Sequence, residues 1–152
     1  MPNFTRKRLA HGVPNWIDDG ATYFITMNCR QRGCETLIVD ATAQAIKQAI
    51  QNYTDQGKWW PQLFVLMPDH LHALCSLNTA SYGIRQIISP WKGYLHKSQN
   101  IEWQEGFFEH RIRSQDALVE KAQYMRLNPV RAGLTDRPES WPYLWSTEDF
   151  QK

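Results

Sequence analysis

The run Leu63-Phe64-Val65-Leu66-Met67-Pro68-Asp69-His70-Leu71-His72-Ala73-Leu74-Cys75 constrains this chain's architecture most strongly. It predicts a strand over residues 62–67, a turn at Pro68-Asp69 and a second strand over residues 71–77. Side chains two apart in a strand point to the same face, so His70 and His72 converge while Leu71 faces a core. Two convergent imidazoles can hold a divalent ion.

Outside this hairpin, two further strands and two helices follow from residue patterns. Residues 21–29 are rich in aromatic and β-branched side chains, and residues 107–113 alternate aromatic, charged and aliphatic ones, as strands do. Apolar residues at helical spacing predict helices over residues 40–56 and 81–99. Pro90 lies inside the second of these and should kink it or split it in two.

A third helix is predicted after the fourth strand. Ser114 or Asp116 can cap its N-terminus, and it should run to Asn128 and end at Pro129. The remaining tail, residues 137–152, is rich in aromatic side chains and should fold back onto the domain.

This order of elements, β-α-β-β-α-β with a terminal helix, predicts an α+β fold of the ferredoxin-like, split β-α-β type. Such a fold has an antiparallel sheet with two helices on one face, which leaves the other face for chemistry. The third helix would follow this unit, with the aromatic tail after it. We expect a single domain over residues 1–152, with a basic N-terminal arm (1–20) and the aromatic tail (137–152).

Composition narrows the class of protein. A chain of 152 residues with 42% hydrophobic content is long enough for a real core. No apolar run approaches the roughly 18 residues of a membrane span, and the N-terminus lacks a secretory signal. Three cysteines without a Cys-x-x-Cys pair indicate reduced thiols, so we expect a cytoplasmic protein with no membrane association. The net charge of +2 is too small to prove nucleic-acid binding.

The stretch Tyr124-Met125-Arg126-Leu127-Asn128-Pro129 supplies the second chemical motif. Residues four apart share a helix face, so Tyr124 and Asn128 should project together, with Lys121 below them. An ion held by two histidines and an amide oxygen can polarise a phosphoryl group. Beside such a cation a tyrosine phenolate becomes accessible as a nucleophile toward a phosphodiester.

These motifs, in this order, resemble the single-tyrosine HUH (His-hydrophobic-His) transposases, and in particular their REP-associated branch, which is linked to repetitive extragenic palindromes. The resemblance covers nearly the whole chain. It is carried by Leu9-Ala10-His11-Gly12-Val13-Pro14-Asn15-Trp16, Tyr23-Phe24-Ile25-Thr26, Pro68-Asp69-His70-Leu71-His72, Trp103-Gln104-Glu105-Gly106-Phe107-Phe108-Glu109-His110-Arg111-Ile112-Arg113, Tyr124 to Leu134, Trp141-Pro142-Tyr143 and Trp145-Ser146.

The resemblance implies roles for four residues. His70, His72 and Asn128 would be the metal ligands, and Tyr124 the nucleophile. The activity implied is cleavage and rejoining of single-stranded DNA next to hairpins, through a 5′-phosphotyrosine link that leaves a free 3′-hydroxyl. Magnesium or manganese is the implied ion, and an amide oxygen suits such a hard cation better than zinc.

Single-stranded DNA is bound by positive charge along its backbone and by aromatic faces under its bases. The candidate DNA contacts are Arg6, Lys7, Arg8, Lys92, Lys97, Arg111, Arg113, Arg126 and Arg131. Glu109, His110 and Lys121 are candidate supporting groups around the site. Glu109 and His110 would point to opposite faces of a strand, so at most one of the two can join the site.

Two other functions are consistent with parts of the pattern. The chain could be a catalytically idle hairpin-binding protein descended from a transposase, or a zinc or oxidative metalloenzyme that uses the histidine pair. The absence of a third histidine or carboxylate at facial-triad spacing disfavours the metalloenzyme. We expect a monomer, since the aromatic tail could hold the catalytic helix in place, with a dimer that exchanges tyrosines as the alternative.

Overall fold

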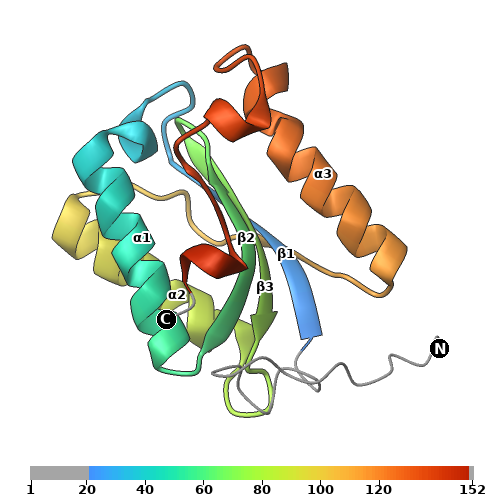
Figure 1. The fold of residues 1–152 in the computed structure, drawn as a ribbon. Helices are drawn as coiled ribbons and strands as arrows, with labels where there is room; N and C mark the ends of the chain where they lie inside the picture. The colour runs from blue at the N-terminus through green and yellow to red at the C-terminus, as the bar shows by residue number, and fades with distance from the viewer. Residues whose placement is uncertain (1–20, 151–152) are drawn as a thin grey trace.

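The chain folds as a β-α-β-β-α-β unit followed by a third helix and a short fifth strand (Figure 1). The computed structural model describes residues 21–150, so the basic arm expected at residues 1–20, with Arg6, Lys7 and Arg8, lies outside the described residues. The strands are β1 (Ala21–Asn28), β2 (Trp59–Leu66), β3 (His70–Leu77), β4 (Phe108–Arg111) and β5 (Leu144–Ser146). The helices are α1 (Asp40–Asp55), α2 (Ile84–Gln99) and α3 (Gln115–Arg131), with short 3-10 helices at Thr36–Ile38, Pro138–Ser140 and Thr147–Asp149.

All neighbouring strands of the single sheet are antiparallel, in the order β4-β1-β3-β2-β5. Its first four strands have the order of the predicted ferredoxin-like fold, which is therefore confirmed. Residues directly opposite each other on paired strands share a face of the sheet. Phe108, Thr26, His72, Val65 and Leu144 thus form one row across all five strands.

The two faces of the sheet are covered by different helices. Figure 1 shows α1 and α2 on one side and α3 on the other. The α1/α2 side buries the larger core, which includes Ile25, Leu71 and Trp59 at 0% exposure. A smaller apolar cluster around Leu74 and Met125 joins the opposite face to α3. The predicted placement of two helices on one face of the sheet is confirmed.

Strand boundaries differ modestly from the predicted ones. β2 begins at Trp59 rather than at residue 62, because the Trp59 side chain is buried in the α1/α2 core. β4 covers only Phe108–Arg111, and all four of its residues are exposed at the edge of the sheet. An edge strand forms hydrogen bonds with a neighbour on one side only. The strand predicted over residues 107–113 is therefore shorter in the structure.

Pro90 was predicted to kink or split the second helix, and the split is wrong: α2 runs unbroken through it. A proline within a helix leaves the carbonyl four residues earlier without its usual partner. Here that carbonyl belongs to Gln86, and both Gln86 and Pro90 are exposed. Water can therefore hydrogen-bond the carbonyl, and the buried residues of the helix hold it against the sheet.

The prediction that Pro129 ends the third helix is also wrong. α3 continues to Arg131, and Ala132 is its C-cap. Pro129 is buried, and the turn after it is closed by hydrogen bonds from Ala132 N–H to the Asn128 carbonyl (3.0 Å) and from Leu134 N–H to the Pro129 carbonyl (2.9 Å). Asn128 is thus inside the last turn rather than a cap.

The aromatic tail folds back as predicted. β5 pairs with β2, and Trp145 lies buried against the α1/α2 core. On the other face, the Trp141 indole N–H donates to the Leu66 carbonyl (2.9 Å) and its ring packs with the α3 cluster. None of the helices between residues 21 and 150 has the length and apolar character that a membrane crossing requires.

Candidate active site

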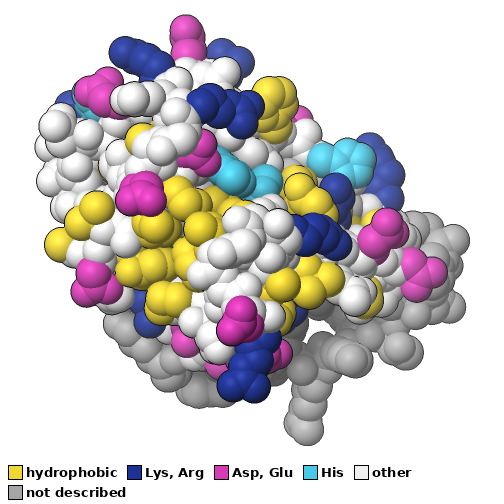
Figure 2. Space-filling view, turned by 90° about the horizontal axis from the view of Figure 1, so that it is seen from above, with side chains coloured by type: hydrophobic (Ala, Val, Ile, Leu, Met, Phe, Trp, Pro, Cys, Tyr) yellow, Lys and Arg dark blue, Asp and Glu magenta, His cyan; other side chains and the backbone are white. Residues whose placement is uncertain are grey.

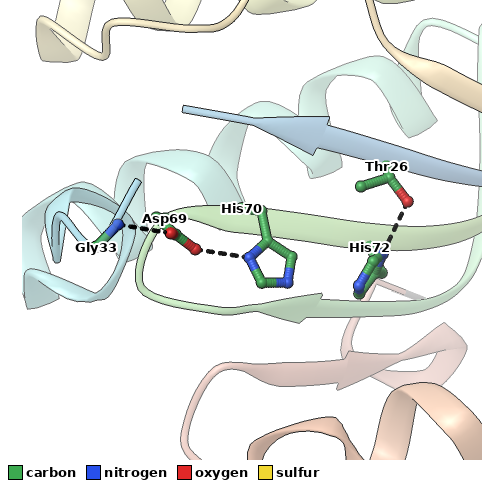
Figure 3. Close-up of polar contacts among 5 residues, drawn as sticks. All are labelled: Thr26, Gly33, Asp69, His70 and His72. Atoms are coloured by element: carbon green, nitrogen blue, oxygen red, sulfur yellow. Dashed lines mark hydrogen bonds and ion pairs between the residues drawn. The ribbon is translucent and has the colours of Figure 1, made fainter. Parts of the chain in front are cut away.

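The two histidines stand at the start of β3, on the sheet face covered by α3 (Figure 3). Their ring centroids are 4.9 Å apart, with the ring planes at 74°. Leu71 between them is fully buried in the opposite core. The convergence of His70 and His72 that strand periodicity predicted is therefore present.

His70 is held by a relay of hydrogen bonds from the β1–α1 loop. Its Nδ1 lies 2.7 Å from Oδ1 of Asp69, whose Oδ2 accepts from the Gly33 backbone N–H at 2.8 Å. Burial opposes ionisation of Asp69, but the bonds from Gly33 and His70 outweigh it and keep the pKa of this carboxyl below its usual value. A carboxylate on Nδ1 fixes the ring orientation and leaves Nε2 available as a ligand.

His72 is deeper than its neighbour, with 7% of its surface exposed. Its Nδ1 lies 2.9 Å from the Thr26 hydroxyl on β1, and its ring stacks on Phe24 at 5.1 Å. Burial, followed by the charges of His70 and Lys121, lowers the pKa of His72 to about 3. The imidazole is therefore neutral at physiological pH, which is the form that binds a metal.

Helix α3 carries Tyr124 to this histidine pair. Its N-terminus is capped by Ser114, whose hydroxyl accepts from the Ala117 N–H (3.1 Å), so Ser114 rather than Asp116 is the cap. Met125 anchors the helix in the apolar cluster on the sheet. The adjacent Tyr124 side chain remains 41% exposed, and its ring lies 5.9 Å from that of His72. Histidine pair and tyrosine thus come together within one chain.

Two cations lie against the tyrosine ring. The Lys121 ammonium is 5.5 Å and the Arg131 guanidinium 5.4 Å from its centroid. Lys121 also contacts Phe24, at 4.6 Å from the ring centre. These side chains place positive charge where a phosphate approaching Tyr124 would bind. Figure 2 shows histidine side chains at the surface of the molecule with Lys and Arg side chains close to them.

Asn128 lies one helical turn beyond Tyr124 and is partly buried. Its backbone carbonyl is used by the helix, through the bond from Ala132, but its side-chain amide is not needed as a cap. Helical geometry places this amide on the same side of α3 as Tyr124. Its part as a third ligand stays a prediction.

The donor set of the site suits a hard divalent cation. Among residues 21–150, no group of three histidine, cysteine or carboxylate side chains is arranged to hold a metal. If the described residues alone supply a ligand beyond His70 and His72, it would be an amide, hydroxyl or carbonyl oxygen. Oxygen donors of that kind suit Mg²⁺ or Mn²⁺, whereas closed zinc sites use cysteine and histidine.

The register of β4 separates the two candidate supporting groups on that strand. His110 is opposite Phe24 and shares the face of the histidine pair, whereas Glu109 is opposite Ile25 and shares the face of α1 and α2. Arg111, opposite Tyr23, also lies on the face away from the site. Of the two candidates, only His110 can serve the site.

Lys92 is not the surface contact that the sequence suggested. It is 7% exposed, and its ammonium donates to the carbonyls of Gln104 (2.9 Å) and Gly106. The Trp103 indole in turn donates to the Lys92 carbonyl (3.0 Å). Lys92 thus fastens the loop before β4 to α2, and its charge is already satisfied by backbone.

The other candidate DNA-binding residues in the described chain lie on different sides of the sheet. Lys97 is exposed near the end of α2, on the side of the sheet opposite the site. Arg113, Arg126 and Arg131 are exposed just before or along α3, on the side of the site. Arg6, Lys7 and Arg8 lie outside the described residues.

Sequence reasoning missed the groups that orient the two histidines. Thr26 and Phe24 are on a strand far from β3 in the chain, and only the β1–β3 register brings them to His72. Gly33 reaches Asp69 across the β1–α1 loop. Asp69 could have been found, since a carboxylate next to a candidate ligand is a usual orienting group.

A ferredoxin-like sheet that presents two histidines to a tyrosine on a facing helix is the arrangement expected of a single-tyrosine transposase. The chain is 28% identical over 130 residues to the REP-associated tyrosine transposase of Escherichia coli (strain K12), a match covering 82% of this chain and 75% of that protein. A solved structure of a REP-associated tyrosine transposase bound to a REP hairpin has the same fold, with a TM-score of 0.73 at 24% identity over 82% of this chain and 76% of the other. No protein-family model matches the chain. The chain is a relative of the REP-associated tyrosine transposases, as its motifs indicated.

Proposed function

We propose that this protein cuts and rejoins single-stranded DNA beside a hairpin, with Tyr124 as the nucleophile and a divalent cation at His70 and His72. The observation that carries the proposal is the 5.9 Å separation between the rings of Tyr124 and His72, with the tyrosine partly exposed. The relatives' names support the substrate: one is a REP-associated tyrosine transposase and another was solved with a REP hairpin.

The reaction proposed is an in-line displacement at phosphorus. The Tyr124 oxygen loses its proton and attacks the scissile phosphate, forming a bond to phosphorus as the bond to the 3′-oxygen breaks. The 3′-oxygen takes up a proton, and the 5′-phosphate stays on the tyrosine. Attack by a 3′-hydroxyl on this link reverses the step and joins DNA, so no external energy source is needed.

Each side chain of the site has a part in this step. His70 and His72, oriented by Asp69 and Thr26, would hold Mg²⁺ or Mn²⁺ through Nε2, with Asn128 as the oxygen ligand. When bound, such an ion would neutralise charge on the phosphate. Lys121 and Arg131, against the tyrosine ring, would fix the phosphate next to the nucleophile.

The test is a denaturing gel of end-labelled, single-stranded hairpin oligonucleotides incubated with protein and Mg²⁺ or Mn²⁺. We expect a metal-dependent, protease-sensitive adduct with the native protein and none with Tyr124→Phe, which loses only a hydroxyl and should bind the hairpin normally. Tyr94→Phe is the matched control, because Tyr94 is also exposed but lies on α2, across the sheet.

The alternative function, an idle hairpin-binding protein, predicts a different gel. Native protein and Tyr124→Phe would then bind hairpins equally and neither would form an adduct. An adduct that persists in Tyr124→Phe would instead show that another residue is the nucleophile. Failure of both binding and cleavage on every hairpin would count against the proposed substrate.

A further inference from the structure

Two of the three cysteines lie together at the end of β1, next to the loop that supports His70. Cys29 is buried and Cys34 partly exposed, and the two side chains lie near enough for each to affect the other's pKa. Cys75, the third, is fully buried in the α1/α2 core. Of the three thiols, the Cys34 thiol is thus the one that solvent reaches most readily.

The segment between the two thiols is tied to the hairpin that carries His70. The Cys29 N–H donates to the Asp69 carbonyl (2.8 Å), and the Gly33 N–H donates to the Asp69 carboxylate (2.8 Å). Further along, the Leu37 N–H donates to the Pro68 carbonyl (3.1 Å). Gly33 is the immediate neighbour of Cys34 and has a φ of +83°, which other residues adopt only with strain.

We propose that Cys29 and Cys34 form a reversible disulfide, and that this bond shifts the Gly33–Asp69–His70 relay. The two sulfurs must approach to about 2.05 Å to form the bond. This contraction displaces Cys34 toward Cys29 and carries the Gly33 N–H with it. Since Asp69 is bound to both Gly33 and His70, the orientation of the His70 ring changes with the thiol state.

The oxidant is a peroxide or another two-electron acceptor. The Cys34 thiolate attacks one peroxide oxygen, the O–O bond breaks, and a sulfenic acid forms. The Cys29 sulfur then attacks the Cys34 sulfur and releases the oxygen as water. Overall, two thiols and one hydrogen peroxide give one disulfide and two waters, and a dithiol reductant reverses the change.

The two thiols are suited to different steps. Burial raises the pKa of Cys34, but hydrogen bonds with Thr36 and Cys29 outweigh this and leave it below the usual thiol value. Burial, with the nearby Cys34 and Asp69, raises the pKa of Cys29 to about 12. Cys34 is therefore the thiol that reacts with the oxidant, and closure by Cys29 is the slower step.

The experiment treats metal-free, folded protein with stoichiometric hydrogen peroxide in the Cys75→Ala background. We expect loss of both thiols, recovery with dithiothreitol, and tryptic peptides joined through Cys29 and Cys34, since Arg30 and Arg32 between them provide cleavage sites. Cys34→Ser should keep Cys29 as a free thiol. If both thiols survive peroxide, or if oxidation stops at sulfenic or sulfinic acid with no linked peptide, the disulfide is disproved.

The coupling to His70 is measured by imidazole NMR of the same samples at one fixed pH. We expect the His70 signals to move on oxidation and return on reduction. A disulfide that forms without moving the His70 signals would disprove the coupling.

A third readout, DNA cleavage, depends on the proposed function: the oxidised protein should cleave more slowly than the reduced protein. If even the reduced protein does not cleave, the proposed function fails while the thiol and NMR results stand.

Discussion

His72 shows how a single buried side chain links stability to the proposed chemistry. The residue is neutral because its surroundings disfavour the protonated form, through burial first and then through His70 and Lys121. Neutrality leaves a ring nitrogen able to bind a cation. It also makes the folded state sensitive to acid, since the unfolded chain protonates this imidazole at a higher pH than the folded chain does.

Because of His72, the protein should become less stable as the pH is lowered. Its pKa is about 3 in the folded protein against 6.5 for an ordinary histidine, so between these values the unfolded state binds one more proton. The free energy of unfolding should therefore be unaffected by His72 above about pH 6.5 and decrease as pH falls toward 3. Urea unfolding in EDTA should show a smaller acid loss for His72→Gln than for native protein or for exposed His110→Gln. Equal losses would contradict a depressed pKa at His72.

Asp69 should affect metal affinity without being a ligand. Asp69→Asn keeps the size of the side chain but removes the charge that holds His70 Nδ1. Loss of such a supporting partner weakens metal binding by about 10–100-fold. Calorimetric titration with Mn²⁺ checks this, with exposed Asp136→Asn as the matched control. Unchanged affinity in Asp69→Asn would mean that this carboxylate does not support the site.

At the scale of elements, α3 decides whether the site is complete. The sheet supplies the histidines, but the tyrosine arrives on a helix that is held by the small cluster around Met125 and by the returning tail. Pro129 does not end this helix, so Asn128 and Arg131 remain in its last turn. Packing of α3 thus positions the nucleophile and its flanking cations as one unit.

Met125→Ala should weaken the packing of α3 on the sheet and lower the free energy of unfolding. Met125 is fully buried, and truncation of such a side chain costs about 2–5 kcal/mol of stability. Gln123→Ala, on the exposed side of the same helix, should cost little. Denaturant unfolding measures both. If the two variants are equally stable, α3 does not depend on the apolar cluster.

At the scale of the whole molecule, two helices cover one face of the sheet and leave the other to α3 and the site (Figure 1). The face under α1 and α2 therefore forms the main hydrophobic core, whereas the face under α3 buries only a small apolar cluster. Because Tyr124 faces His72 of its own chain, we propose that the protein acts as a monomer with a self-contained site.

Mixing inactive variants tests this self-contained site. Tyr124→Phe keeps the histidines and His72→Ala keeps the tyrosine, so exchange of tyrosines between chains would rebuild one good site in a mixture. We expect an equimolar mixture to form no DNA adduct, and light scattering to report a monomer. Recovery of cleavage in the mixture would show that the tyrosine is delivered by a partner chain.

Local patterns in the sequence were enough to predict the order of the first four strands and the three helices, the shared face of His70 and His72, and the projection of Tyr124 from α3, but not the fifth strand in the tail. These depend on backbone periodicity, which acts over a few neighbouring residues. The same patterns wrongly ended the third helix at Pro129 and allowed a split at Pro90, because tertiary packing or an exposed carbonyl compensates for a proline in a helix.

The tertiary structure alone decided which groups surround the site. Thr26 meets His72 across 46 positions of the chain and Gly33 meets Asp69 across 36. The burial of Lys92 depends on loop packing, and the strand register decides that His110 rather than Glu109 shares the face of the site. Such contacts join residues far apart in the chain, and their register and burial are properties of the assembled sheet that no local spacing encodes.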